Sequence, residues 1–436
     1  MAKITKKHLL RIGFEPGAAL KAALLAMADP RFAKKSHEAK FALLQDLLSE
    51  PEKYRRHIVL APVVDALIGE VEKTGPTYLA LNTETLPYKV YGAEGIEAGA
   101  LHQMAIAARL PVARAAALMP DAHQGYGLPI GGVLATENAI IPYAVGVDIG
   151  CRMALTVYPL SASYIDGHHN LLKRELIAQT FFGPGKGPDQ PMPDPVLDRP
   201  EFREIAIVKG LKDKAWRQIG SSGGGNHFVE FGEVEILAEN GEWALKPGKY
   251  LAVLSHSGSR GLGAGIADYY TKVAMETCKL PREAKHLAWL DMDSEAGQEY
   301  WLAMNLAGDY ASACHRHIHE RLSKAIGEKP AIRVENHHNF AWKEHLPDGK
   351  EVIVHRKGAT PAGKGVLGII PGSMTAPGFI VRGKGEARAL HSASHGAGRV
   401  LSRSKAKSSL TKHALNKILR EHQVTLIGGD LDEAPM

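Results

Sequence analysis

The sequence predicts a mixed α+β protein in which a helical N-terminal extension precedes one larger domain. Two observations support this prediction. Apolar residues recur at helical spacing up to about residue 73, and short apolar runs that end at glycine-rich turns follow from about residue 85. Spacing alone predicts only strand-turn-helix fragments. Their assembly into mixed sheets with surrounding helices rests on the family resemblance carried by the motifs below.

The predicted extension covers residues 1–84. Apolar residues such as Leu43, Leu44, Leu47 and Leu48 lie three and four positions apart, which is the spacing of one buried helix face. Between residues 75 and 90, this pattern gives way to prolines and to a composition rich in Tyr and Val. This change predicts the domain boundary, with the larger domain spanning residues 85–436.

The larger domain is expected to begin with a helix at about 96–110. Strand-like runs at 115–119, 131–136 and 140–148 come next, and helix-like stretches flank a loop rich in Pro and Gly at 182–188. An apolar strand at 250–254 then leads through a Ser/Gly/Arg turn into a helix expected from about residue 264.

Composition limits the class of protein. Among the 436 residues, 45% are hydrophobic and 23% are charged, as in ordinary globular proteins. The net charge of +6 favours an anionic partner such as nucleic acid. Three cysteines (Cys151, Cys278 and Cys314) are too few for a disulfide framework and indicate a reducing compartment. With no signal-peptide pattern and no long apolar run, we expect a cytoplasmic protein without a membrane segment.

A candidate metal site begins at Asp148 and Cys151, a carboxylate and a thiol three residues apart between glycines. Downstream, His227, His256 and His338 each lie in or beside a polar turn and could fold back onto this pair. His338 follows directly on His337, and adjacent strand residues point to opposite faces, so we expect only one of the two rings to reach a shared site. Ligand softness alone favours zinc for such a donor set.

Two glycine-rich turns suit phosphate. The run 220–230 lets backbone amides approach an anion without side-chain interference, although a simple structural turn explains this run equally well. At 255–263, Arg260 offers a planar fork of donors where a helix should begin. His395 lies between Ser and Gly, where it is either an accessible nucleophile or a structural histidine, and this stretch alone leaves both open.

His315 and His319 form a competing pair on one helical face, at a spacing that can hold a metal. That face carries no acidic or thiolate partner. The pair is flanked by Arg316, Glu320 and Arg321, which predicts an exposed or RNA-facing helix instead of a metal site.

Together these motifs closely resemble the RtcB family of RNA-splicing ligases, from about residue 85 to the C-terminus. The matching pieces are the runs 119–125, 146–151, 225–228, 256–261, 338–339, 356–359, 371–374 and 394–399. So many pieces in this order do not assemble by chance.

The resemblance implies two Mn²⁺ ions bridged by Cys151, with Asp148 and His227 holding one ion and His256 and His338 the other. Manganese is the family's metal and replaces the zinc that ligand softness favours. The resemblance also implies GTP contacts at Asn226, His227, Phe228, Val229, Glu230, His338, Asn339, Pro371, Gly372, Ser373, Met374, the position of Gly378, His395, Gly396, Ala397 and Gly398.

The implied activity is that of a GTP- and Mn-dependent RNA ligase in RNA repair or tRNA splicing. It joins a 3′-phosphate or 2′,3′-cyclic phosphate end to a 5′-hydroxyl end through a guanylyl group on His395, with Arg260 and Arg399 as phosphate clamps. A helper protein for guanylylation stays an open question. Three alternatives also stay open: a guanylyltransferase that only caps 3′-ends, a cyclic phosphodiesterase, and a non-catalytic RNA-binding paralogue.

The chain departs from the family pattern at three points. Gly378 stands where the family has a guanosine-binding Ser, which predicts the loss of one contact. The family continues past Asp-Glu-Ala-Pro-Met to a guanine-binding Lys, whereas this sequence ends at Met436. Arg152 replaces a frequent Gly beside the bridging thiolate and predicts an extra positive charge near the metals.

Overall fold

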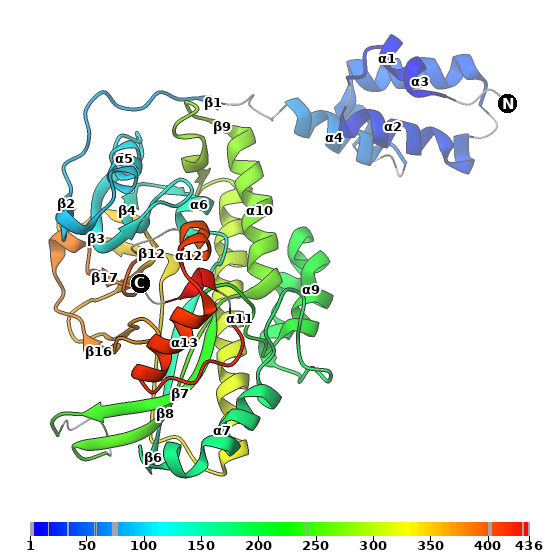
Figure 1. Ribbon diagram of the computed structural model, residues 1–436. Helices are drawn as coiled ribbons and strands as arrows, with labels where there is room; N and C mark the ends of the chain where they lie inside the picture. The colour runs from blue at the N-terminus through cyan, green and yellow to red at the C-terminus, as the bar shows by residue number, and fades with distance from the viewer. Residues whose placement is uncertain are drawn as a thin grey trace. The chain divides into compact units, whose positions relative to one another are not determined.

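The computed structural model describes residues 4–15, 17–32, 35–55, 57, 59–71, 77–239, 243, 245–399, 403–429 and 431–434. It divides into two compact units, residues 1–77 and 78–436 (Figure 1). Part of the region in which the domain boundary is predicted, residues 72–76, lies outside the described residues, and the boundary after residue 84 stays a prediction. Within the described ranges, every helix is too short or too polar to span a bilayer.

The first unit is helical, as predicted. Its elements are α1 (Lys6–Arg11), α2 (Ala18–Ala28), η1 (Pro30–Phe32), α3 (His37–Ser49), η2 (Pro51–Tyr54) and α4 (Ala61–Val71). The side-chain oxygen of Ser36 accepts a hydrogen bond from the backbone N–H of Ala39 and so caps α3. Leu44 and Leu47 are fully buried with Leu9 and Val63, which confirms the apolar face read from their spacing.

The second unit mixes helices and strands, which confirms the α+β prediction. Its helices are η3 (Ala93–Gly95), α5 (Ala98–Ala107), α6 (Pro142–Val145), α7 (Tyr164–Gln179), η4 (Pro195–Asp198), α8 (Glu201–Glu204), α9 (Ala206–Gln218), α10 (Arg260–Thr277), η5 (Lys285–Leu287), α11 (Glu295–Ile326), η6 (Ala387–Ala389), α12 (Arg403–Ser409), α13 (Lys412–Glu421) and η7 (Leu431–Glu433).

Two larger sheets form the centre of this unit, with strand orders β12-β13-β4-β3-β2 and β11-β6-β8-β7. The strands are β1 (Thr77–Tyr78), β2 (Lys89–Val90), β3 (Ala113–His123), β4 (Ile130–Thr136), β5 (Ala139–Ile140), β6 (Arg152–Ser161), β7 (Phe228–Ile236), β8 (Gly248–Ser257), β9 (Cys278–Lys279), β10 (Leu290–Asp291), β11 (Ile332–His337), β12 (Asn339–His345), β13 (Glu351–Lys357), β14 (Ala359–Pro361), β15 (Leu367–Ile370), β16 (Phe379–Arg382) and β17 (Ser392–Ser394).

The antiparallel register of the four-stranded sheet brings one end of every strand to the same edge. His256 near the end of β8 pairs with Phe228 at the start of β7 and with Met153 near the start of β6. Met153 in turn pairs with Asn336 near the end of β11. Residues just before β6 and β7, and just after β11, therefore meet at this edge.

The long helices α10 and α11 pack against each other, and α11 also contacts β6 and β8 (Figure 1). Their apolar faces meet in a core that includes Ile266, Tyr270, Tyr300 and Tyr310. The sheet that carries the candidate metal donors is thus backed by a rigid helical layer.

Two expectations about local structure are wrong. Residues 140–148 do not form one strand, because Pro142 occupies the first turn of α6, where its fixed φ and missing N–H are tolerated. The helix expected from about residue 264 begins at Arg260, directly after the Ser/Gly turn.

Candidate metal and nucleotide site

The five predicted metal donors meet at the common edge of the four-stranded sheet. Cys151 directly precedes β6, His227 directly precedes β7, and His256 lies near the end of β8. His338 connects β11 to β12, and its N–H donates to the carbonyl of Cys151 at 3.0 Å. The loop that carries Asp148 is held by a second backbone bond, from the N–H of Gly150 to the carbonyl of Asn339 at 2.8 Å.

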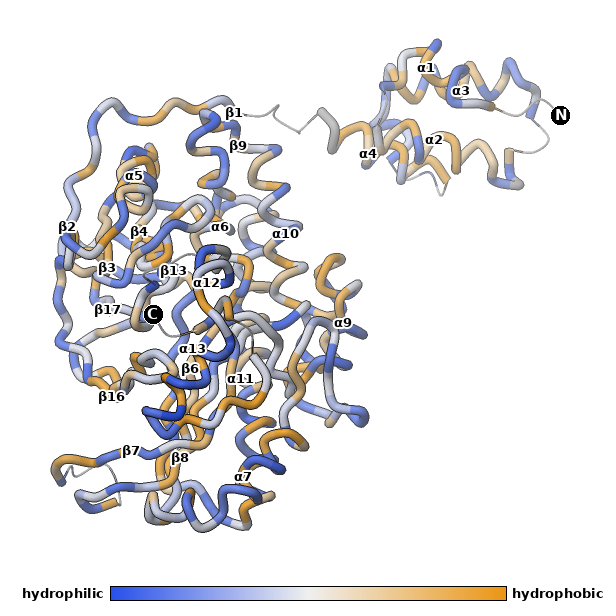
Figure 2. Tube along the Cα trace, viewed as in Figure 1, coloured by the Kyte–Doolittle hydropathy of each residue, from blue (hydrophilic) through white to orange (hydrophobic). Residues whose placement is uncertain are grey.

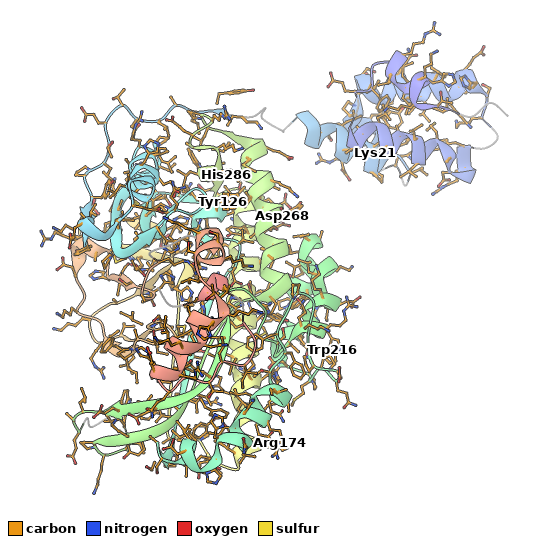
Figure 3. The ribbon with its side chains drawn as sticks, viewed as in Figure 1. Lys21, Tyr126, Arg174, Trp216, Asp268 and His286 are labelled. Atoms are coloured by element: carbon orange, nitrogen blue, oxygen red, sulfur yellow. The ribbon has the colours of Figure 1, made fainter. Side chains whose placement is uncertain are left out.

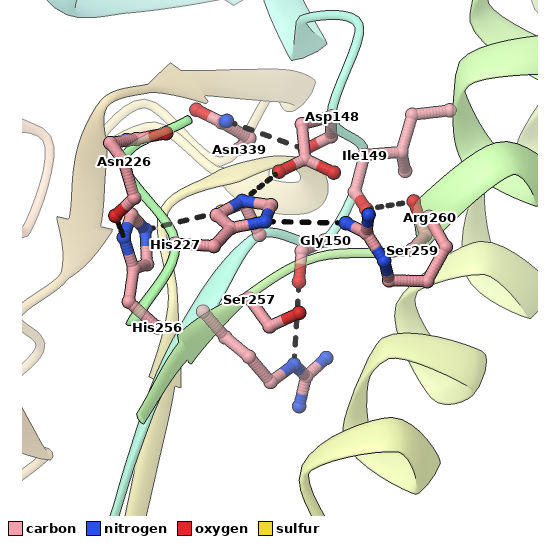
Figure 4. A network of polar contacts seen from close by, with 12 residues as sticks. Asp148, Ile149, Gly150, Asn226, His227, His256, Ser257, Ser259, Arg260 and Asn339 are labelled. Carbon is pink, nitrogen blue, oxygen red and sulfur yellow. Dashed lines mark hydrogen bonds and ion pairs between the residues drawn. The ribbon is translucent and has the colours of Figure 1, made fainter. Parts of the chain in front are cut away.

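The donor atoms form a continuous chain of short contacts. His227 Nε2 lies 2.9 Å from Asp148 Oδ2 and 3.5 Å from Cys151 Sγ. Cys151 Sγ lies 3.2 Å from His256 Nε2, which in turn lies 3.2 Å from His338 Nε2. Figure 4 shows His227 between Asp148 and Arg260, with His256 beside it. A thiol, a carboxylate and three imidazoles therefore converge.

The second ring nitrogens of His256 and His227 contact other groups. The Nδ1 of His256 donates to the carbonyl of Asn226 at 2.9 Å, so its Nε2 keeps a free lone pair. Arg260 Nη1 lies 3.2 Å from Nδ1 of His227, and Arg260 has a φ of 54°. This left-handed conformation is uncommon at a non-glycine residue.

Glycine at position 258 makes room for the carboxylate. A Cβ placed on Gly258 would lie 2.1 Å from Oδ1 of Asp148. Any side chain there would displace the carboxylate from His227. The position of Asp148 thus requires glycine at 258, in the turn after His256.

Burial and charge set the protonation of the donors. Burial raises the pKa of Asp148, but the hydrogen bond and charge of His227 outweigh it and lower that pKa to about 2. Burial lowers the pKa of His256 to about 3 and the pKa of His338 well below its ordinary value. Burial also raises the pKa of the Cys151 thiol. The neutral imidazoles of His256 and His338 and the carboxylate of Asp148 are ready ligands, and the thiol needs a cation to become a thiolate.

The donor set fits a metal. The ligand atoms of Cys151, His227 and His256 all lie within 4.8 Å of one another. The Nδ1 of His338 is buried and makes no hydrogen bond, so the ring is held by its position in the β11–β12 connection. One sulfur, one carboxylate and three imidazole nitrogens suit a divalent transition-metal ion.

His395 is held by a carboxylate that the sequence did not single out. Asp121 Oδ2 lies 2.8 Å from Nδ1 of His395 and accepts the N–H groups of His395 at 3.1 Å and Gly396 at 3.2 Å. The Asp121 side chain is almost fully buried. Asp121 lies within the run 119–125, one of the pieces that match the family.

A proton on Nδ1 of His395, donated to Asp121, leaves the lone pair on Nε2 free. The ring of His395 lies 5.0 Å from that of His338, centroid to centroid. A nucleophilic nitrogen thus lies beside the candidate metal ligands.

The candidate site opens into a cavity of about 3460 Å³. All the residues predicted to contact the nucleotide line it, from Asn226–Glu230 through His338, Asn339, Pro371–Met374 and Gly378 to His395–Gly398. The structure therefore brings these residues together, and their contacts with a nucleotide stay a prediction. Arg399 also lines the cavity, with Nη1 2.8 Å from Oε2 of Glu433.

Close packing surrounds Gly378. A Cβ placed there would lie 2.9 Å from the carbonyl oxygen of Ile370 and 3.0 Å from Cα of Pro371. A serine at this position requires a shift of the 370–372 backbone. The backbone around position 378 thus leaves room for glycine and not for the serine of the family pattern.

The expectation that His315 and His319 lie on an exposed or RNA-facing helix is wrong. Both rings are buried where α11 crosses β8. The hydroxyl of Ser255 lies 2.6 Å from His315 Nδ1 and 2.7 Å from His319 Nε2. The charged residues that flank the two histidines in sequence suggested a solvent-exposed helix. Instead, both rings form hydrogen bonds with Ser255, the residue before His256 on β8.

Contrary to the prediction from the sequence, Arg152 does not direct its charge at the candidate metal site. Its guanidinium is buried and donates to the carbonyl of Gly308 on α11 at 2.7 Å, with Glu335 at 3.2 Å. The side chain therefore turns toward α11, and its charge is used to attach the start of β6 to that helix.

Comparison with known proteins identifies the family. The family model described as "tRNA-splicing ligase RtcB" matches residues 103–194 and 200–435. The chain is 33% identical over 364 residues to the RNA-splicing ligase RtcB of Escherichia coli K12, covering 76% of this chain and 85% of that protein. It is 30% identical over 445 residues to the tRNA-splicing ligase RtcB of Nanoarchaeum equitans, covering 85% and 92%.

Proposed function

The chain belongs to the RtcB family of RNA ligases, and we propose that it uses GTP and Mn²⁺ to join RNA ends. The substrates are an RNA with a 3′-phosphate or 2′,3′-cyclic phosphate and an RNA with a 5′-hydroxyl. The observation that carries the proposal is the position of His395, which is held by Asp121 next to the convergent donors.

Cys151 would bridge two ions, with Asp148 and His227 on one and His256 and His338 on the other. The short donor contacts from Asp148 to His338 support this division. Bound divalent ions would offset negative charge on the phosphate oxygens.

In the first step, Nε2 of His395 attacks the α-phosphorus of GTP. A phosphorus–nitrogen bond forms, the bond to the β-phosphate oxygen breaks, and pyrophosphate leaves. Asp121 keeps the proton on Nδ1 and stabilises the positive charge that the ring acquires. The orientation of the ring follows from the contact of its Nδ1 with Asp121 and from the two backbone N–H groups that the same oxygen accepts.

In the second step, an oxygen of the RNA 3′-phosphate takes the guanylyl group from His395. Cyclic ends are hydrolysed to the 3′-phosphate beforehand. The 5′-hydroxyl then attacks the activated 3′-phosphorus, a 3′,5′-phosphodiester forms and GMP leaves. Arg260, whose Nη1 lies 3.2 Å from Nδ1 of His227, is suited to neutralise phosphate oxygens.

The surface beside the cavity supports an RNA substrate. Helix α13 packs its apolar residues Leu415 and Leu419 near Met374 and exposes Lys412, Lys417 and Arg420 to solvent. Figure 2 shows hydrophilic stretches along α12 and α13. A basic face next to a phosphate-handling cavity suits a polyanion.

We also propose a cytoplasmic site of action. All three cysteines are free thiols, and a Cys151 ligand requires a compartment that keeps it reduced.

The proposal is tested with α-labelled GTP and MnCl₂, followed by peptide mass spectrometry. Label is expected on His395 in the wild type, lost in His395→Ala and kept in His345→Ala, where an exposed histidine of β12 is removed. Failure of the wild type to become labelled while it retains bound metal would contradict GTP-driven ligation. Labelled His395 without joined RNA would favour a capping enzyme, and opening of cyclic ends without GTP would favour a phosphodiesterase.

A further inference from the structure

An exposed aromatic residue forms part of the cavity wall. Tyr126, in the turn between β3 and β4, is 70% exposed and lines the cavity. Its ring centroid lies 6.4 Å from that of Tyr143 and 6.1 Å from that of His286. Tyr143 and His286 themselves meet edge to face at 5.1 Å. Figure 3 labels Tyr126 next to His286. These three residues are called the aromatic cluster below.

The exposure of Tyr126 does not come from a loose turn. The ammonium of Lys357 donates to the carbonyl of Tyr126 and, at 2.9 Å, to that of Tyr143. On the other side, the N–H of Gly125 donates to Oε1 of Gln103 at 3.1 Å. Gly127 has a φ of 71°, and a Cβ there would lie 2.8 Å from the carbonyl oxygen of His286. The turn is therefore held closely against η5.

The aromatic cluster is connected to the reacting groups through Lys357. The next residue, Gly358, approaches His395 so closely that a Cβ on it would lie 3.2 Å from Cε1 of that ring. Lys357, which donates to the Tyr126 carbonyl, is therefore next in sequence to a glycine beside the His395 ring. The exposed ring and His395 line one cavity.

Single-stranded RNA ends present unpaired bases, and proteins hold such bases by stacking them on exposed aromatic faces. We propose that Tyr126 is a stacking platform for the base of the terminal nucleotide at the RNA joint, with Tyr143 and His286 fixing the ring. This inference rests on the proposed RNA substrate, and it assigns to Tyr126 a contact with a base. Stacking accepts every base, which suits an enzyme that must join ends of varied sequence.

The test measures RNA binding, so that its outcome does not depend on catalysis. Equilibrium dissociation constants are determined for the wild type, Tyr126→Phe and Tyr126→Ala. The RNAs have intact ends, an abasic 3′-terminal nucleotide or an abasic 5′-terminal nucleotide. Tyr126→Ala is expected to weaken binding of intact RNA by roughly 5- to 150-fold, the range for one stacked base. Tyr126→Phe keeps the ring and should bind as the wild type does.

The abasic RNAs distinguish stacking from a general effect on the turn. With one of the two abasic ends, the wild type and Tyr126→Ala are expected to bind equally, because no base is present to stack. Tyr269→Ala, which removes an exposed tyrosine of α10 outside the cavity, serves as the control. Equal binding of intact RNA by the wild type and Tyr126→Ala would overturn the proposal, as would a loss that persists with both abasic RNAs. Failure of the proposed ligase function would appear separately, as an unlabelled His395.

Discussion

Nδ1 of His395 lies 2.8 Å from Oδ2 of Asp121, and the same oxygen accepts the backbone N–H groups of His395 and Gly396. One carboxylate oxygen therefore fixes both the ring and the backbone of the proposed nucleophile. Hydrogen bonds to a charged acceptor are stronger than neutral ones, so this contact is well suited to set the tautomer of the ring.

Replacement of Asp121 by Asn is expected to slow guanylylation of His395. The amide keeps the size of the carboxylate but removes its charge and turns part of it into a donor. Loss of one hydrogen bond to a charged group costs about 1.5–3 kcal/mol, which corresponds to roughly a 10- to 150-fold lower rate. The rate is measured with α-labelled GTP under single-turnover conditions.

The control for Asp121→Asn is Asp268→Asn, which removes an exposed carboxylate on α10 (Figure 3). Asp268→Asn should guanylylate at the wild-type rate. A wild-type rate in Asp121→Asn would mean that the contact with His395 has no role in the first step.

Replacement of Gly378 by Ser is expected to impair GTP use. The family likeness alone suggests that a serine restores a guanosine contact. The packing predicts the opposite effect on GTP use. The Cβ of a serine at 378 would lie 2.9 Å from the Ile370 carbonyl oxygen and force the 370–372 backbone to move. The KM for GTP should rise and the thermal unfolding temperature should fall. A lower KM at an unchanged unfolding temperature would show that the loop accommodates the serine.

Much of the candidate site could be predicted because its residues lie in short motifs at strand ends. Asp148, Cys151, His227 and His256 were expected to meet, and the register of β6, β7 and β8 explains why they do. The adjacent pair His337 and His338 was expected to split between two faces. The structure places His338 against His256 and packs His337 on Trp342.

The remaining features depend on contacts that are distant in sequence. Asp121 and His395 are 274 positions apart, and no local pattern joins them. His315 and His319 have charged neighbours in sequence, yet α11 turns them toward β8. Sequence periodicity cannot tell which face of a long helix is covered when both faces carry polar residues.

Stability is expected to depend on pH through Lys357. Burial lowers the pKa of its ammonium to about 7, whereas the ordinary value in an unfolded chain is 10.5. Between these values the unfolded chain holds a proton that the folded chain lacks. The free energy of unfolding should therefore rise with pH from about 7 to 10.5, by at most about 1.4 kcal/mol per pH unit, and lose this dependence below 7.

The measurement for Lys357 compares chemical denaturation of the wild type and Lys357→Met at several pH values from 6 to 10. The difference between the two free energies of unfolding should change in favour of the wild type as pH rises. Parallel curves across this range would show that the two carbonyl acceptors, Tyr126 and Tyr143, keep the ammonium charged in the folded state.

The basic face of α13 is expected to bind the RNA backbone. Lys412, Lys417 and Arg420 are exposed on α13, whereas Leu415 and Leu419 are buried, and the segment that follows, 422–429, lines the cavity. Two of these groups keep donors for phosphate. Lys417 makes an exposed pair with Glu421 at 4.0 Å, and Arg420 donates from its Nε to the carbonyl of Asn416. Such contacts act through counterion release and are insensitive to base sequence.

Replacement of all three residues by Gln should weaken RNA binding at low salt and make it less dependent on salt. Each lost phosphate contact lowers the slope of log K against log salt by about 0.7 for a single strand, so three contacts lower it by about 2. Three exposed lysines of α9 and α10, Lys209, Lys212 and Lys272, provide a control variant with the same change in net charge. If the slope of log K against log salt falls as much in the control variant as in the α13 variant, the change in net charge alone explains the effect. A slope lost only in the α13 variant would place the RNA backbone along this helix, because overall charge is matched between the two proteins.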